Sequence, residues 1–143
     1  ALSLPANLYK NMYPHQRQGV EWLWGLHQGD MGGILGDDMG LGKTYSPLQV
    51  ACFLAGLFLT HQAKSVLVVA PLSVIRGWEE ELGRWIVFKA CPSVEVSVIT
   101  SSTRNETRRR MVQNALRGGK TRLGCVCVTS YGLVSSQPHV FGP

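Results

Sequence analysis

The chain has 143 residues and a mass of 15.7 kDa, enough for one domain with a substantial core or for part of a larger one. Hydrophobic residues make up 45% and charged residues 16%, which excludes an intrinsically disordered chain, and no uninterrupted run of 18 apolar residues or signal-peptide pattern predicts a membrane or secretory segment. The formal net charge of +5 is a modest excess that bears on partners only where it is concentrated.

The first 30 residues are predicted to form a lead-in and one helix. Residues 2–11 contain Pro5 and are expected to be irregular. A helix is predicted to begin at Pro14, because the missing N–H of proline costs nothing at the first helical position. Apolar residues follow helical spacing from there until Gly29, which is predicted to end the helix.

A glycine-rich stretch between two apolar segments is the strongest functional signal in the sequence. The run Gly33-Ile34-Leu35 is predicted to be a strand, and an apolar helix is predicted to continue to about Thr60. Between them the sequence is Gly36-Asp37-Asp38-Met39-Gly40-Leu41-Gly42-Lys43-Thr44. Such a turn wraps backbone N–H groups around a phosphate, with Lys43 facing the β/γ-phosphates and the Thr44 hydroxyl binding Mg²⁺. The alternative, a turn that carries Gly-Lys-Thr by chance, is disfavoured by the strand and helix signals on either side.

Strands and helices are predicted to alternate in the rest of the chain. Strands are expected over residues 65–70, 94–100 and 123–129, the first covered by helices on both faces. A helix is expected over residues 73–85, with the acidic run at residues 79–81 facing solvent. Another is expected to open with a capping box of Thr103 and Glu106 and to close at Gly118-Gly119, and a turn or helix is expected over residues 130–134. This alternation predicts an α/β fold with a parallel sheet.

Basic residues are concentrated in one segment. Half of the 14 lysines and arginines lie between Arg104 and Arg122, against a single acid, Glu106. The segment is either a weak, non-specific contact for DNA or a solvated helix face, and the sequence leaves both open. The three consecutive arginines at residues 108–110 cannot all point in one direction on a helix.

The four cysteines are too few for a disulfide scaffold, and a C-x-C pair without nearby Cys or His partners is a poor zinc site. We expect buried thiols in a reducing compartment, with Cys125 and Cys127 on one face of a strand.

Four separated stretches resemble motifs of the Swi/Snf family of ATP-dependent DNA translocases. Residues 13–23, which begin Tyr13-Pro14-His15-Gln16-Arg17, are similar to the adenine-reading glutamine motif, and residues 33–44 are similar to the nucleotide motif. Residues 66–85, which include Ala70-Pro71-Leu72-Ser73, resemble the next motif, and Val128-Thr129-Ser130-Tyr131 resembles the one after it. The resemblance covers the chain from about residue 4 to residue 134. Residues 22–27 and 53–57 look most like the Cockayne syndrome group B type within this family.

The resemblance implies the first of two RecA-like lobes, a parallel sheet with helices on both faces, truncated at its C-terminal end. Residues 1–30 would be the lead-in and adenine-motif helix, and residues 31–143 a partial ATP-binding lobe. Gln16 would read the adenine, and ATP and Mg²⁺ would be held by Asp37, Asp38, Met39, Gly40, Leu41, Gly42, Lys43 and Thr44, with Lys43 in the catalytic role. The backbone of double-stranded DNA would be met by Ser73, Thr129, Ser130 and Tyr131. These turns follow strands, and ligands of open α/β sheets bind at the carboxyl ends of strands.

The resemblance also implies a nuclear protein of DNA repair or chromatin remodelling, with nucleosomes as a candidate partner, a second lobe, and no membrane association. The sequence departs from the family pattern at three places. His15 replaces the usual aromatic residue, and it is either an adenine-side contact or a solvent-facing residue. No Asp-Glu-x-His box follows Tyr131 within the 143 residues, so this chain alone is not expected to hydrolyse ATP.

The third departure is an insertion, Tyr45-Ser46-Pro47, directly after the nucleotide motif. Pro47 would fall just past the first turn of a helix that starts near Gly42, where it costs about 3 kcal/mol. Ser46 and Pro47 are themselves a good helix start, which would displace the helix from the phosphates and weaken nucleotide binding. In the alternative, the extra residues bulge outward and the phosphate turn keeps its geometry.

Two further function classes compete with the translocase. A small-molecule P-loop kinase is disfavoured, because about three dozen residues precede the loop and no acceptor-site motif follows it. A truncated, non-catalytic isoform that binds DNA or a protein partner remains an alternative.

Overall fold

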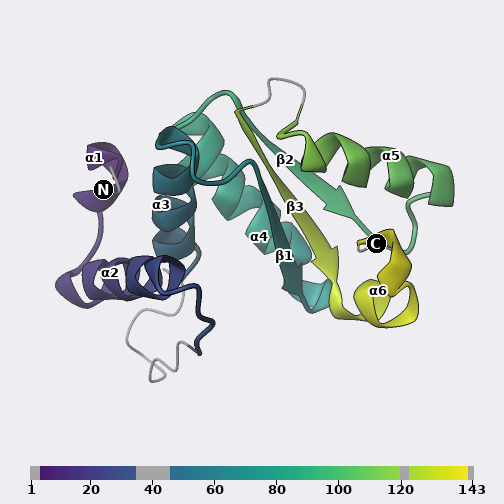
Figure 1. Ribbon diagram of the computed structural model, residues 1–143, viewed down its shortest axis with the longest axis horizontal. Helices are drawn as coiled ribbons and strands as arrows, with labels where there is room; N and C mark the ends of the chain where they lie inside the picture. Colours follow the sequence, from purple (N-terminus) through teal and green to yellow (C-terminus); the bar gives the residue numbers. More distant parts are fainter. Residues whose placement is uncertain (1–3, 35–45, 120–122, 142–143) are drawn as a thin grey trace.

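The computed structural model describes residues 4–34, 46–119 and 123–141, and its centre is a parallel sheet of three strands (Figure 1). The strands are β1 (Ser65–Ala70), β2 (Val94–Ile99) and β3 (Gly124–Ser130), in the spatial order β1-β3-β2. The central strand β3 is buried along its whole length, as expected for a parallel strand that is covered on both faces. At the edge of the described sheet, β1 exposes Ser65 and Leu67, so the prediction that this strand is covered throughout is wrong for these residues.

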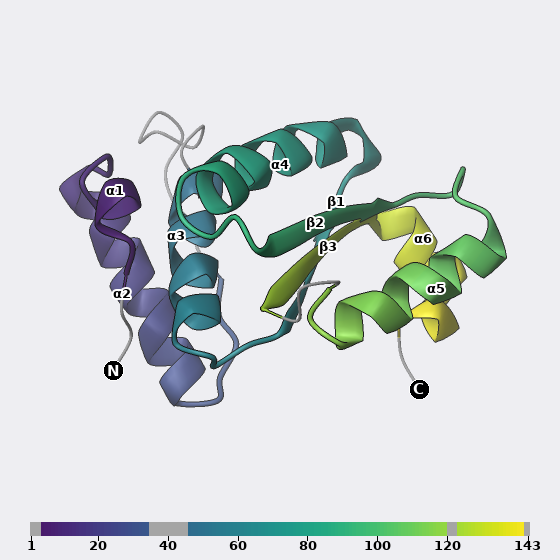
Figure 2. The ribbon, with the colours of Figure 1, turned by 90° about the horizontal axis from the view of Figure 1, so that it is seen from above.

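Helices lie on both faces of the sheet. Figure 2 shows α4 (Ile75–Leu82) on one face, and α5 (Asn105–Leu116) and α6 (Tyr131–Ser136) on the opposite face. The remaining helices, α1 (Ala6–Tyr9), α2 (Pro14–Gln28) and α3 (Ser46–Leu59), stand together at one side, and α3 also packs against α4. The predicted parallel sheet with helices on both faces is confirmed. No helix in the described segments combines the length and apolar character that a bilayer span requires.

The alternation of side chains along β3 divides the core into two clusters. Val126 and Val128 belong to the larger cluster, together with buried residues of all four helices α1–α4. Cys125 and Cys127 point to the other face, where they pack with residues from β2, α5 and α6. Leu8 and Val20 are fully buried in the larger cluster, so the first 30 residues share one core with the sheet.

Several predicted boundaries are correct. Helix α2 begins at Pro14 and has Gly29 as its C-cap. Helix α5 ends at Leu116, and Gly118 and Gly119 have φ angles of +85° and +81°, the left-handed conformation that lets glycine close a helix.

Other local predictions are wrong, each for an identifiable reason. The lead-in contains the short helix α1, which anchors Leu8 in the core. Residues 33 and 34 form no strand, and Ile34 is 92% exposed. The capping box at Thr103 is absent because its hydroxyl accepts a hydrogen bond from the Thr100 N–H (3.2 Å), and α5 begins two residues later.

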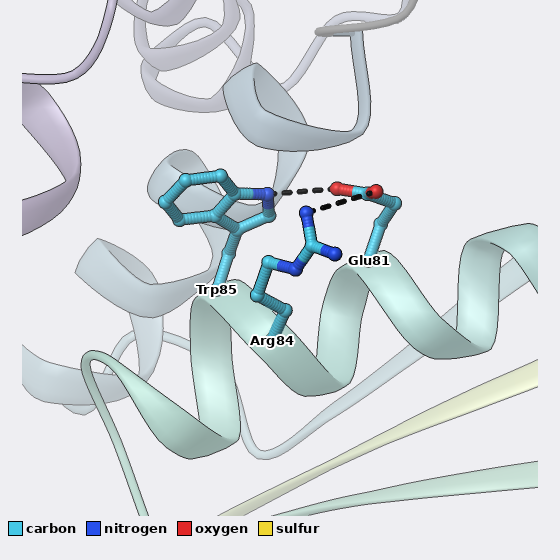
Figure 3. Close-up of polar contacts among 3 residues, drawn as sticks. All are labelled: Glu81, Arg84 and Trp85. Carbon is cyan, nitrogen blue, oxygen red and sulfur yellow. Dashed lines mark hydrogen bonds and ion pairs between the residues drawn. The ribbon is translucent and has the colours of Figure 1, made fainter.

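The helical segment that follows β1 is longer than predicted. A 3₁₀ turn (Leu72–Val74), α4 and a π-helical turn (Gly83–Phe88) are continuous, and the segment extends past Trp85 because Ile86 is fully buried. Its acidic run does not simply face solvent. The Trp85 Nε1–H donates a hydrogen bond to Glu81 Oε2 (2.8 Å), and Arg84 lies 3.6 Å from Glu81 Oε1 (Figure 3).

Candidate functional site

Gln16 is held inside the N-terminal end of α2. The backbone of Tyr13 is extended, Pro14 starts the helix, and the Tyr13 N–H donates a hydrogen bond to Gln16 Oε1 (2.8 Å). This bond satisfies a backbone donor that has no partner within the helix. The side chain is only 2% exposed, so its orientation is fixed by the fold.

The amide nitrogen of Gln16 is the unusual atom of this segment. Nε2 is buried, and no hydrogen-bond acceptor contacts it among the residues that the structure describes. An unpaired buried donor costs about 1–3 kcal/mol, so it is more often found paired. Because the oxygen is used by Tyr13, this nitrogen is the group that Gln16 can offer to a ligand.

A second glutamine joins α2 to the helix that follows the glycine-rich stretch. Gln49 of α3 is also 2% exposed, and its Nε2 donates a hydrogen bond to the Gln16 carbonyl (3.2 Å). Gly19 leaves the space for this amide, since a Cβ there would lie 2.6 Å from Gln49 Nε2. The position of Gln16 is therefore fixed relative to α3. Gln49 was not predicted to belong to the site, although a polar residue in an otherwise apolar helix was the available signal.

His15 lies beside this site without entering the core. Its ring stacks on that of Tyr13, with a centroid separation of 5.9 Å and an interplanar angle of 10°. The residue is half-buried, and neither of its two predicted roles is decided by this contact.

The phosphate-binding residues predicted from the sequence lie outside the described part of the chain. They are Asp37, Asp38, Met39, Gly40, Leu41, Gly42, Lys43 and Thr44, and the Mg²⁺ ligand Thr44 is among them. Helix α3 is described from Ser46 onward, and residue 45 is also outside the described segments. The effect of Tyr45-Ser46-Pro47 on nucleotide binding stays a prediction.

The two turns predicted to meet DNA lie side by side at the carboxyl edge of the sheet. Ala70, the last residue of β1, pairs with Ser130, the last residue of β3, and Thr129 pairs with Ile99 of β2. The chain leaves β1 into the turn at residues 71–73 and leaves β3 directly into α6. This juxtaposition follows from the parallel sheet, because parallel strands end at one edge.

The four residues predicted for DNA contact differ in accessibility. Ser73 is exposed and Tyr131 is 58% exposed. Thr129 is fully buried and its hydroxyl donates to the Ile99 carbonyl (2.8 Å). The buried Ser130 caps α6, because its Oγ accepts a hydrogen bond from the Leu133 N–H (3.2 Å). Thr129 and Ser130 therefore shape the turn, and Ser73 and Tyr131 are the side chains open to a ligand.

A sequence model of the SNF2-related domain matches residues 15–142, which include both the glutamine segment and this edge. The chain belongs to the SNF2-related domain family. The resemblance to the Swi/Snf motifs is thereby confirmed.

Curated SNF2 relatives share substantial identity with this chain. The SNF2 domain-containing protein ENL1 of Oryza sativa is 55% identical over 80 residues, which cover 56% of this chain and 8% of that protein. The DNA excision repair protein ERCC-6-like of Danio rerio is 36% identical over 142 residues, 99% of this chain and 9% of that protein. The DNA excision repair protein CSB of Oryza sativa is 36% identical over 108 residues, 76% of this chain and 8% of that protein, in agreement with the predicted subtype. The chain spans 7 to 12% of the length of such relatives.

A solved SNF2 structure confirms the fold. The Sulfolobus solfataricus SWI2/SNF2 ATPase core in complex with dsDNA superposes with a TM-score of 0.63 at 25% sequence identity. The match covers 96% of this chain and 24% of that chain. The fold is thus the RecA-like fold of an SNF2 ATPase core, as the resemblance implied.

The basic segment of this SNF2-related chain is not a uniform surface. Arg109 and Arg110 are exposed, but Arg108 is 6% exposed and makes hydrogen bonds from its guanidinium to three neighbouring oxygens. Arg108 is therefore not a surface cation, which agrees with the expectation that the three arginines do not share one direction, and the choice between a DNA contact and a solvated face stays open for the rest of the segment. The signal for its burial was helical spacing, since Arg108 lies four and seven residues before Val112 and Ala115, which face the sheet.

The cysteines of the SNF2-related chain are all free thiols in the core, as predicted. Burial raises the pKa of Cys52 to about 12. Burial, followed by the proximity of Cys125, raises the pKa of Cys127 to about 12. These thiols are protonated at neutral pH, which makes them poor nucleophiles and poor metal ligands.

Proposed function

We propose that this chain is the ATP-binding part of the first lobe of a nuclear, DNA-dependent SNF2 ATPase that acts in DNA repair or chromatin remodelling. The observation that carries the proposal is Gln16, a buried glutamine whose amide nitrogen has no acceptor among the described residues. Its backbone is tied through Gln49 to the helix that follows the glycine-rich stretch. A purine edge carries the ring-nitrogen acceptor that such a donor lacks.

The chain's own residues would divide the work on ATP as follows. Gln16 would donate from Nε2 to the adenine edge while Tyr13 holds its oxygen in place. Backbone N–H groups of residues 37–44 would hold the phosphates, Lys43 would place a charge against the β/γ-phosphates, and Thr44 would bind Mg²⁺. Bound Mg²⁺ would neutralise charge that develops on the phosphates.

Double-stranded DNA is the proposed partner of the carboxyl edge. The exposed Ser73 and Tyr131 are the side chains offered there, and they follow neighbouring strands. The solved relative that the fold matches is in complex with dsDNA, which supports this assignment. The Ser73 hydroxyl and the Tyr131 phenol would contact the phosphate backbone of DNA. Such contacts hold the duplex in position but do not read its bases, so we expect no base specificity.

Turnover requires parts that these 143 residues do not contain. The sequence has no Asp-Glu-x-His box, and a phosphoryl-transfer site also needs an arginine that faces the transferred phosphate, here from a second lobe. We therefore expect only background phosphate release from the 143-residue chain, with or without DNA. Robust DNA-stimulated release would contradict this assignment of roles.

Gln16→Glu tests the adenine assignment with little change in shape. The substitution keeps an oxygen for the Tyr13 N–H and removes the Nε2 donor. Loss of one hydrogen bond of about 1–1.5 kcal/mol should weaken ATP binding roughly 5- to 10-fold. The matched control is Gln18→Glu, the same change at an exposed position of the same helix. Calorimetric titration of ATP gives the result, and an unchanged ATP affinity in Gln16→Glu would refute the assignment.

The same titration tests the phosphate turn. Lys43→Ala should weaken ATP binding by roughly 10- to 150-fold, since a charge-assisted contact contributes about 1.5–3 kcal/mol. Deletion of Tyr45-Ser46-Pro47 should tighten ATP binding if the insertion displaces the helix start. Equal or weaker binding after the deletion would favour the outward bulge.

A further inference from the structure

A small polar pocket lies between the start of α5 and the 3₁₀ turn Pro138–Val140. Its volume is about 150 Å³, and it is lined by Asn105, Arg109, Gln137, His139 and Val140. No carboxylate is among these described lining residues. Ligand pockets for whole small molecules measure roughly 300–1,000 Å³, so this one suits a single small group.

Arg108 orients two side chains of this pocket so that they present hydrogen-bond donors. Arg108 does not line the pocket itself, but its Nη1 donates hydrogen bonds to two lining residues, at Asn105 Oδ1 (3.0 Å) and Gln137 Oε1 (2.7 Å). Each amide oxygen thus already accepts one hydrogen bond from this cation, and the NH₂ groups are the donors that the two amides can offer. Within the described residues these two NH₂ groups donate no hydrogen bond. Arg109 and the imidazole N–H of His139 add further donors.

The charge beside the pocket is also uncompensated. Arg108 is 6% exposed, its third bond goes to the neutral Ser101 carbonyl (2.7 Å), and its Nε has no partner. No carboxylate pairs with it in the described part of the chain. A buried cation without a counter-ion is costly, and an anion in the adjoining pocket would offset that cost. The first turn of α5 adds its positive end, and its N-cap makes no side-chain hydrogen bond.

We propose that this pocket binds a backbone phosphate of double-stranded DNA. The choice of DNA rests on the proposed function, in which Tyr131 contacts DNA. The chain segment that begins at Tyr131 leads directly to the residues that line the pocket. Helix α6 runs from Tyr131 to Ser136, and the next residue, Gln137, lines the pocket. A DNA strand whose backbone contacts the exposed Tyr131 would thus have a second phosphate contact at Arg109 and His139. Free phosphate has the same chemistry and is the competing source.

Arg109→Gln and Arg110→Gln test the proposal as a matched pair. Both arginines are exposed neighbours on α5 and both changes remove one charge, but only Arg109 lines the pocket. We would measure binding of the full 143-residue chain to a fluorescent DNA duplex over a range of salt concentrations. Arg109→Gln should flatten the slope of log K against log salt by about 0.9, the value for one phosphate contact. Arg110→Gln should leave the slope unchanged, and equal effects of the two variants would overturn the proposal.

Inorganic phosphate separates the two sources. Ring signals of His139 in NMR spectra should shift saturably with phosphate in the wild type and in Arg110→Gln, and not in Arg109→Gln. Saturable shifts combined with an unchanged DNA salt slope in Arg109→Gln would mean a free-phosphate site and would overturn the DNA assignment. If the wild type binds ATP through Gln16 but no duplex, the DNA part of the proposed function and this proposal both fail, while the adenine assignment stands. If the wild type binds the duplex and Arg109→Gln and Arg110→Gln have equal salt slopes, only the proposal for this pocket is refuted.

Discussion

Gly19 and Gly25 provide a direct test of the contact that positions Gln16. Both glycines lie in α2, where replacement by alanine removes a helix penalty of about 1 kcal/mol. Around Gly25 a Cβ would meet nothing within 4 Å, so Gly25→Ala should stabilise the chain by about that amount. At Gly19 the new Cβ would lie 2.6 Å from Gln49 Nε2 and 3.3 Å from its Cδ.

The cost at Gly19 comes from hydrogen bonding more than from steric repulsion. The amide of Gln49 ends a flexible side chain and can move, but it then leaves the Gln16 carbonyl (3.2 Å). Gln16 and Gln49 are both 2% exposed, so groups left unpaired there cost about 1–3 kcal/mol. After the helix gain of about 1 kcal/mol, Gly19→Ala should range from neutral to about 2 kcal/mol destabilising. It should be about 1–3 kcal/mol less stable than Gly25→Ala.

Equilibrium unfolding in urea measures both variants, provided that their m-values agree. Gln49→Ala supplies the decisive background, because it removes the atoms that the new Cβ would displace. In that background Gly19→Ala should become stabilising, and the difference is the coupling energy of the pair. Two alanine variants of equal stability, or no coupling to Gln49, would refute the reasoning.

Three further predictions concern the core, the α4 segment and pH. Gly124→Ala would place a Cβ 2.6 Å from Cε1 of the fully buried Phe58, and this overpacking should lower the free energy of unfolding by about 1–3 kcal/mol. Thermal unfolding measures the change, and an unchanged melting temperature would contradict the packing described. Trp85→Phe removes the donor to the Glu81 carboxylate and should lower stability by about 1 kcal/mol in urea unfolding, whereas unchanged stability would mean that water replaces the bond fully. The pKa of Cys127 is raised from 9.0 to about 12 by burial, so the thiol ionises first in the unfolded chain and stability falls above pH 9 by about 1.4 kcal/mol per pH unit from this residue. Between pH 9 and 10.5, the free energy of unfolding of Cys127→Ala should fall less steeply with pH than that of the wild type, by that slope. Equal slopes in the two proteins would show that burial does not suppress the ionisation of Cys127.

The sequence predicted those features of the fold that depend on local pattern. Pro14 and Gly29 bound α2 because one residue suits a helix start and the other a helix end. The positions of β1, β2 and β3 were predicted within one residue, since continuous apolar runs between turns specify buried strands. What local pattern could not predict was the spatial order of the strands, which depends on contacts between distant segments.

Polar residues were the least predictable part of the site. The sequence showed that the three arginines at residues 108–110 cannot share one direction, but which of them is buried depends on oxygens supplied by residues 101, 105 and 137. Thr129 matches a DNA motif, yet its hydroxyl is directed to the carbonyl of Ile99 on a neighbouring strand. Gln16 was singled out by its motif, but only the structure shows which of its two polar atoms is still available.

The central position of β3 sets the order in which the sheet can assemble. Ser65 of β1 pairs with Cys125, and Val94 of β2 pairs with Gly124, so neither outer strand has its partner until the last of the three has been synthesised. Closing such long loops is slow, because their entropy must be lost before the strands gain their contacts. During translation, β1 and β2 therefore lack β3, the strand that they pair with in the described sheet, and exposed strand edges favour aggregation and chaperone binding. A ribosome that pauses before residue 124 would hold β1 and β2 without the strand that joins them in the described sheet.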